Sequence, residues 1–111
     1  MADLSTVEGL HEALADVQLI DCREQYEWDA GRIEGALHIP MNDVMAGVGV
    51  DVLEIAKPVA VICRSGNRSE LAAMMLTARG YDATNVEGGM EAWAAAGYDY
   101  PAPDGSPGRV A

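Results

Sequence analysis

The sequence predicts an α/β fold in which a mostly parallel sheet is covered by helices on both faces. Short apolar runs alternate with helical segments along the chain, and glycine or proline separates many of them. This alternation is typical of strand, helix, strand units, whose connections place helices on both faces of a parallel sheet. A chain of 111 residues has room for one domain, which buries roughly two-thirds of its unfolded surface.

The first elements follow from capping and apolar patterns. Leu4 is expected to close a very short strand. Ser5 and Glu8 have the spacing of a capping box, which predicts a helix that runs to about Ala15. The apolar run 17–22 predicts the next strand.

The middle of the chain holds shorter elements. Residues 25–30 predict a helix that ends at Gly31, and residues 36–39 predict a brief strand before Pro40. Segment 41–56 is expected to be a loop with short helices, because two glycines interrupt its helical pattern.

The clearest pattern in the chain is a strand, a loop and a helix in succession. Apolar residues 59–62 predict a buried strand, residues 63–69 a tight loop, and residues 70–79 a helix that Gly80 ends. Two further elements follow, a strand over 83–86 and a helix over 90–96.

The chain is expected to end in a mobile segment. Residues 1–98 carry all the predicted elements and are expected to form the domain. Prolines and glycines recur over residues 99–111, where we expect no contribution to the core. We therefore predict a flexible tail over 99–111.

Composition argues against several classes of partner. The net charge is −11 and only seven residues are lysine or arginine, whereas binding to nucleic acid or to an anionic membrane needs clustered cations. No apolar run reaches membrane-spanning length, and no basic segment followed by an apolar one stands at the N-terminus. With two cysteines that we expect to be reduced, the sequence indicates a cytoplasmic protein, and we expect neither a metal nor another cofactor.

Cys63 is a candidate nucleophile. It stands where the strand ends and the loop begins, with Arg64 and Arg68 nearby and a helix following. The helix dipole and the guanidinium charges favour the thiolate, and Gly66 lets the loop curl its N–H groups around the sulfur. The alternative is an inert buried thiol, which the flanking cations and glycine make the weaker interpretation.

Two other polar residues are expected at the same edge of the sheet. Asp21 and Arg23 end the strand over 17–22, and binding sites gather at the carboxyl ends of parallel strands. In one interpretation Asp21 accepts hydrogen bonds from the backbone of the Cys63 loop or from an arginine, and thereby holds the shape of that loop. In the other, Arg23 and Glu27 form an exposed helix pair of little energetic consequence.

Cys22 is predicted to be a packing residue and not a resolving thiol. It follows Asp21 at the end of a buried strand, where a small apolar side chain fits well. A disulfide needs Cα atoms no more than about 7 Å apart. We expect the ends of the two strands not to be immediate neighbours, which would keep Cys22 away from Cys63.

Four motifs in order resemble those of rhodanese-like sulfurtransferases. Residues 63–69, CRSGNRS, look like the active-site loop of that family, and residues 21–28 are similar to its D-x-R-x-x-x-E-aromatic signature. Residues 31–40 resemble its G-H-I-x-G-A-x-x-I-P segment, and residues 88–93 its closing G-G-x-x-x-W. Arg32 departs from the pattern, because the family usually has histidine there.

The resemblance implies a single rhodanese-like domain with a five-stranded sheet, and it implies an activity. The Cys63 thiolate would take a sulfane sulfur from thiosulfate or a related persulfide donor and pass it to cyanide or a thiol, through a persulfide on the enzyme. Backbone N–H groups of the loop would stabilise that persulfide, and Arg64 and Arg68 would bind the donor's oxyanion. The implied substrate-binding residues are Arg64, Ser65, Gly66, Asn67, Arg68 and Ser69.

Two alternatives remain open at this point. Phosphatases and arsenate reductases also use a cysteine, a cradle of N–H groups and an arginine, but their loop has one more residue between cysteine and arginine. The shorter spacing from Cys63 to Arg68 therefore favours sulfur transfer. A sulfur-relay or binding module without enzymatic turnover is the other alternative, although scaffold domains of this kind often lack the cysteine.

Overall fold

Four parallel strands form the centre of the protein, in a computed structural model that describes residues 2–111. The strands are β1 (Gln18–Asp21), β2 (Leu37–His38), β3 (Val59–Ile62) and β4 (Ala83–Asn85). Their order in the sheet is β2-β1-β3-β4, and every neighbouring pair runs parallel. All four strands therefore end at the same edge of the sheet.

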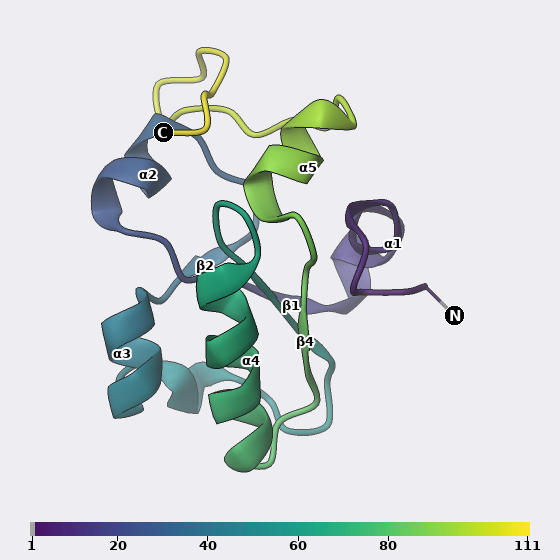
Figure 1. The fold of residues 1–111 in the computed structure, drawn as a ribbon, viewed down its shortest axis with the longest axis vertical. Helices are drawn as coiled ribbons and strands as arrows, with labels where there is room; N and C mark the ends of the chain where they lie inside the picture. The colour runs from purple at the N-terminus through teal and green to yellow at the C-terminus, as the bar shows by residue number, and fades with distance from the viewer. Residues whose placement is uncertain (1) are drawn as a thin grey trace.

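Helices lie on both faces of this sheet, so the predicted three-layer α/β sandwich is confirmed (Figure 1). The α-helices are α1 (Val7–Ala13), α2 (Gln25–Ala30), α3 (Met41–Ala46), α4 (Asn67–Ala78) and α5 (Gly89–Ala95). Two short 3-10 turns, η1 (Leu14–Asp16) and η2 (Val50–Val52), complete the elements. No helix within residues 2–111 is long and apolar enough to cross a membrane.

Alternation along the strands assigns side chains to two cores. Val59 and Val61 of β3 face one core with α3, η2 and α4, whereas Ala60 and Ile62 face the other with α1 and α5. Because helices cover both faces, all four residues of β3 are buried and the strand is apolar throughout. The loop that follows β3 thus emerges from a fully buried central strand.

The sheet has four strands, and the expectation of a fifth was wrong. The chain around Leu4 forms a turn, because the Asp3 carboxylate accepts a hydrogen bond from Ser5 N–H and the Asp3 carbonyl accepts one from Thr6 N–H. Thr6, not Ser5, then caps α1 through its hydroxyl. Asp side chains favour such local turns over extended backbone.

The strand ends that carry the two cysteines are immediate neighbours, contrary to prediction. The register pairs Asp21 with Ile62, and the Cys22 N–H donates to the Ile62 carbonyl over 3.0 Å. The sequence did not reveal this because β2, although it follows β1 in the chain, takes the outer position on the far side of β1. Cys22 and Cys63 therefore lie side by side.

The C-terminal segment contributes to the core, and the expectation that it would not was wrong. Tyr100 and Val110 pack against the core that α1 and α5 share. Pro101 accepts a hydrogen bond from Arg32 N–H over 3.1 Å, and Arg109 N–H donates to Ala30 over 2.9 Å. Tyr98, which precedes this segment, packs against the same core. The mobility of residues 99–111 stays a prediction.

Candidate active site

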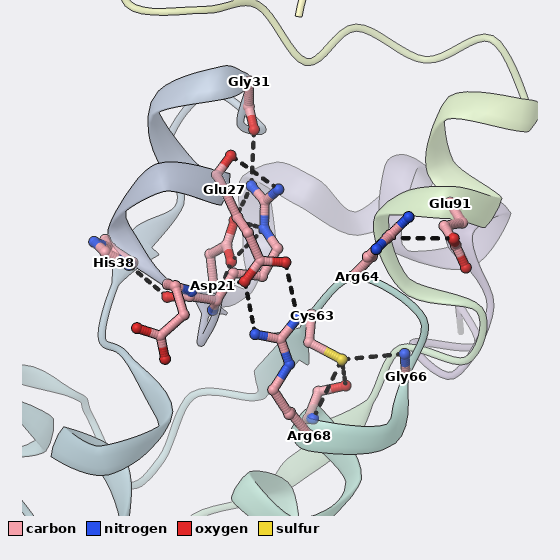
Figure 2. Close-up of polar contacts among 12 residues, drawn as sticks. Asp21, Glu27, Gly31, His38, Cys63, Arg64, Gly66, Arg68 and Glu91 are labelled. Atoms are coloured by element: carbon pink, nitrogen blue, oxygen red, sulfur yellow. Dashed lines mark hydrogen bonds and ion pairs between the residues drawn. The ribbon is translucent and has the colours of Figure 1, made fainter. Parts of the chain in front are cut away.

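Cys63 follows β3 directly, and its sulfur lies in a cradle of donors formed by the loop and the start of α4. Gly66 N–H donates to Cys63 Sγ over 3.1 Å, Ser69 N–H over 3.4 Å and the Ser69 hydroxyl over 3.2 Å. Figure 2 shows the sulfur between Gly66 and the first turn of α4. Cys63 is only 1% exposed, so a small reagent, or the small tip of a larger one, is what the cradle admits.

The cradle depends on close backbone packing against α5. Gly66 has φ +102, a left-handed conformation that turns the chain into α4 without side-chain strain. The first turn of α5 holds the loop from the other side, since Met90 N–H donates to the Cys63 carbonyl and Glu91 N–H to the Arg64 carbonyl. A Cβ at Gly89 would lie 2.4 Å from the Cys63 carbonyl oxygen, so only glycine allows this approach.

The cradle stabilises the thiolate and lowers the pKa of Cys63 to about 4. The largest contribution is a hydrogen bond from Cys22. Burial opposes it, and donors from Ser69 and Gly66 then lower the pKa further. Hydrogen bonds to the charged form favour ionisation, and the N-terminus of the twelve-residue helix α4 acts in the same direction. The predicted acidity is thus supported, although its main cause is hydrogen bonding and not the two arginines.

We expect the rate at which iodoacetamide alkylates Cys63 to stay constant from neutral pH down to about pH 5, because the thiolate is already formed there. Ser69→Ala removes one donor to the sulfur, and it should raise the pH at which the alkylation rate of Cys63 is half-maximal by about one unit. Ser65→Ala is the matched control, since Ser65 is an exposed residue of the same loop. A wild-type midpoint near the ordinary thiol value of about 8.5 would refute the assignment.

Asn85 is a site residue that the sequence analysis missed. It ends β4, and its Oδ1 lies 2.5 Å from the Ser69 hydroxyl, which also contacts Cys63 Sγ. A hydroxyl has one proton and can donate to one of these acceptors at a time, and the charged sulfur is the stronger acceptor. With the Asn85 amide turned over, its N–H donates to Ser69 Oγ while the Ser69 proton goes to the sulfur, so Asn85 positions Ser69. Its place at the carboxyl end of a parallel strand was the signal that could have identified it.

Asp21 and Arg23 form a buried ion pair behind the cradle. Arg23 Nε lies 2.9 Å and 3.0 Å from the two carboxylate oxygens of Asp21, and Nη2 donates to Oδ2 over 2.7 Å. The remaining Arg23 donors reach the carbonyls of Glu27 and Gly31. Of the two interpretations, Asp21 accepting from an arginine agrees with the structure. The exposed helix pair does not, because Arg23 and Glu27 are both buried.

Glu27 connects this buried pair to Arg68 in the first turn of α4, a role the sequence analysis did not assign. Its carboxylate accepts a two-fold ion pair from Arg68, with Nη1 to Oε1 at 2.7 Å and Nη2 to Oε2 at 2.9 Å. Burial acts to raise the pKa of Glu27, but Arg68 and the Glu24 N–H outweigh it and hold the pKa below the usual 4.5. The glutamate at this place in the D-x-R-x-x-x-E signature was the available signal.

The remaining loop residues lie on the outside of the cradle. Arg64 is half exposed and its Nε lies 3.5 Å from Glu91 Oε2, away from the sulfur in Figure 2. Ser65 and Asn67 are exposed. The structure therefore brings Gly66, Ser69 and Cys63 together and leaves Arg64 facing solvent.

Within residues 2–111, no three His, Cys, Asp or Glu side chains are grouped to hold a metal ion.

Fold and site together define an α/β protein with a cysteine at the head of a loop whose hydrogen-bond donors converge on the sulfur. A parallel sheet covered on both faces, with the thiolate at its carboxyl edge, is the framework of this class. The chain belongs to the family of the rhodanese-like domain, which matches residues 6–96. The resemblance seen in the four motifs is thereby confirmed.

Known proteins similar to the chain cover most of its length. A sulfurtransferase of Allochromatium vinosum is 35% identical over 102 residues, which are 88% of this chain and 94% of that protein. The protein YtwF of Bacillus subtilis is 42% identical over 82 residues, 74% of this chain and 78% of its own length. The crystal structure of a rhodanese-related protein from Thermoplasma volcanium has a TM-score of 0.79 and 33% identity, and covers 86% of this chain and 93% of its own.

Proposed function

We propose that the protein is a sulfurtransferase that carries a sulfane sulfur on Cys63. The observation that supports this most directly is a thiolate held by three hydrogen bonds from Gly66 and Ser69. Such donors would stabilise the negative charge as it moves from Sγ to the outer sulfur of a persulfide. The family match, and the name of the relative in Allochromatium vinosum, support sulfur transfer in general.

In the first step, the Cys63 thiolate attacks the outer sulfur of thiosulfate or of a related persulfide donor. A bond forms between Sγ and that sulfur, the donor's S–S bond breaks, and sulfite or a thiolate leaves with the electron pair. A pKa of about 4 for Cys63 means that this step needs no general base at neutral pH.

In the second step, cyanide or the thiolate of an acceptor attacks the outer sulfur of the persulfide. The new bond forms on the acceptor, and the Cys63 thiolate leaves with its electron pair. The cradle that stabilised the nucleophile now stabilises the same group as it leaves. We propose that the protein acts in the cytoplasm, where reducing conditions keep Cys63 free of disulfides, and that a thiol or a protein thiol is the acceptor there.

The two arginines of the loop have different roles in this proposal. Arg64 is 52% exposed and its ion pair with Glu91 is long, so it is free to turn toward the donor's oxyanion. Both Nη atoms of Arg68 are engaged by Glu27. Arg68 therefore acts mainly through the position that this ion pair gives to the first turn of α4.

Intact mass spectrometry tests the proposal. Thiosulfate should add one sulfur atom to the wild type, cyanide should remove it, and thiocyanate should appear in equal amount. Cys63→Ala should show neither event. A sulfur atom that is gained by Cys63→Ala would place the nucleophile elsewhere, and a wild type that gains none would refute sulfur transfer.

Turnover distinguishes the proposal from its rivals. The loop between Cys63 and Arg68 is too short to surround a phosphate ester, so we expect hydrolysis of p-nitrophenyl phosphate to be far slower than sulfur transfer. A Cys63-dependent rate of hydrolysis that matched sulfur transfer would favour a phosphatase. A relay or binding module would take up one sulfur atom and release it only to a single partner, with no repeated turnover on cyanide or small thiols.

A further inference from the structure

A second thiol lies beside the nucleophile. Cys22 follows β1 and Cys63 follows β3, and the register of these neighbouring strands pairs Asp21 with Ile62. The next residue of each strand therefore lies at the same level. Neighbouring strands are about 4.8 Å apart, and the Cα atoms of disulfide-bonded cysteines are usually about 4.4–6.8 Å apart. The backbone thus places the two cysteines within disulfide range.

The two side chains also share one face of the sheet. Ile20 and Val61, a register pair two residues earlier, both face the core beneath α4. Because side chains alternate along a strand, Cys22 and Cys63 return to that face, and both belong to the same core cluster. Both are free thiols. Cys22 is 0% exposed, so its access to a reaction partner is through Cys63.

We propose that Cys22 is the resolving thiol of Cys63: when a hydroperoxide oxidises the Cys63 thiolate, Cys22 closes a disulfide with it. This function is separate from sulfur transfer. A thiolate at neutral pH is the form that peroxides oxidise, and without a second thiol it continues to the irreversible sulfinic and sulfonic acids. The neighbouring thiol stops the oxidation at a form that reductants reverse.

Both steps balance without a further reactant. The Cys63 thiolate attacks one oxygen of hydrogen peroxide, the O–O bond breaks, hydroxide leaves, and the sulfur is oxidised by two electrons to a sulfenic acid. Cys22 Sγ then attacks Cys63 Sγ, the S–O bond breaks, and the hydroxide that leaves takes the Cys22 proton as water. A dithiol reductant returns both cysteines to thiols.

The charge on Cys63 decides when Cys22 reacts. In the resting protein the hydrogen bond to Cys63 is the largest cause that raises the pKa of Cys22, followed by burial and by the charges of Cys63 and Asp21, while Arg68 lowers it. Cys22 thus remains a protonated donor. Oxidation of Cys63 to a neutral sulfenic acid removes the adjacent negative charge, so Cys22 loses its proton more easily at that moment. A persulfide on Cys63 keeps a negative charge beside Cys22, so Cys22 does not lose its proton more easily in that state.

The test follows the intact mass of the reduced protein during exposure to hydrogen peroxide. We expect the wild type to lose two hydrogen atoms and to yield a peptide pair that joins Cys22 to Cys63. Cys22→Ala should instead gain one, two and then three oxygen atoms on Cys63. Cys63→Ala should stay unchanged at Cys22, because that thiol is buried and protonated.

Ile20→Val is the matched control, because it trims the same face of β1 and leaves both thiols in place. It should form the disulfide as the wild type does. Should Cys22→Ala fail to fold, Cys22→Val, which fills the site, replaces it. A wild type that gains oxygen atoms as Cys22→Ala does, or a disulfide between two chains, would overturn the proposal. Because this test contains no sulfur donor and no sulfur acceptor, its failure would leave the proposal of sulfur transfer unaffected.

Discussion

Replacing Arg23 by methionine is expected to lower the free energy of unfolding by about 3–5 kcal/mol, since it leaves a buried carboxylate without its partner. The Asp21 side chain is 1% exposed and receives three hydrogen bonds from the guanidinium. Without Arg23 the carbonyls of Glu27 and Gly31 also lose their donors. Because a domain of this size has about 5–15 kcal/mol of stability, a large part of it would be lost.

Urea denaturation at neutral pH measures this effect, with Arg32→Met as the matched control. Arg32 also carries a guanidinium near α2, but it lies over the Trp28 ring at 4.6 Å and is partly exposed. Losing that contact should cost about 1 kcal/mol or less. The role assigned to Arg23 would be wrong if the two variants were equally stable. Asp21→Asn with Arg23→Met should recover part of the loss, because no buried charge remains.

Arg68→Met is expected to lower the free energy of unfolding by about 2–3 kcal/mol at neutral pH. This is below the value for a fully buried pair, because the Arg68 side chain is 35% exposed whereas that of Glu27 is 2% exposed. Sulfur transfer should fall with it, since the pair fixes the first turn of α4, which supplies Ser69 to the sulfur. Arg79→Met, at the exposed far end of the same helix, should change stability by less than about 0.5 kcal/mol.

The effect of Arg68→Met should depend on pH in a defined direction. The folded-state pKa of Glu27 is held below 4.5, so the stability that this pair contributes is fully present above pH 4.5 and is lost as the pH falls through the folded-state pKa. The stability difference between wild type and Arg68→Met should therefore shrink at about pH 3. A difference that stayed constant from neutral pH to about pH 3 would show that the charge of Glu27 is not its cause.

Local patterns determined much of the fold and the centre of the site. The apolar run of β3, the polar loop after it and the helical pattern of α4 are adjacent in the sequence, so periodicity and capping identify them. The sequence predicted the helix over 25–30 with the bounds that α2 has. Cys63, Gly66 and Ser69 lie within seven consecutive residues that span the loop and the first turn of α4, and local spacing alone indicated an acidic thiol there.

Strand order and long-range packing decided the rest. A two-residue edge strand such as β2 carries too little apolar pattern to reveal its place, and this place is what sets β1 beside β3 and Cys22 beside Cys63. A buried charge needs a partner, but the sequence does not say which one: Glu27 and Arg68 are 41 positions apart and meet only because α2 and α4 pack around the same strand ends. The sequence by itself determined the candidate nucleophile and its loop. Only the tertiary structure decided which thiol and which carboxylate lie against them, because those contacts join segments whose positions are set by the topology of the whole sheet.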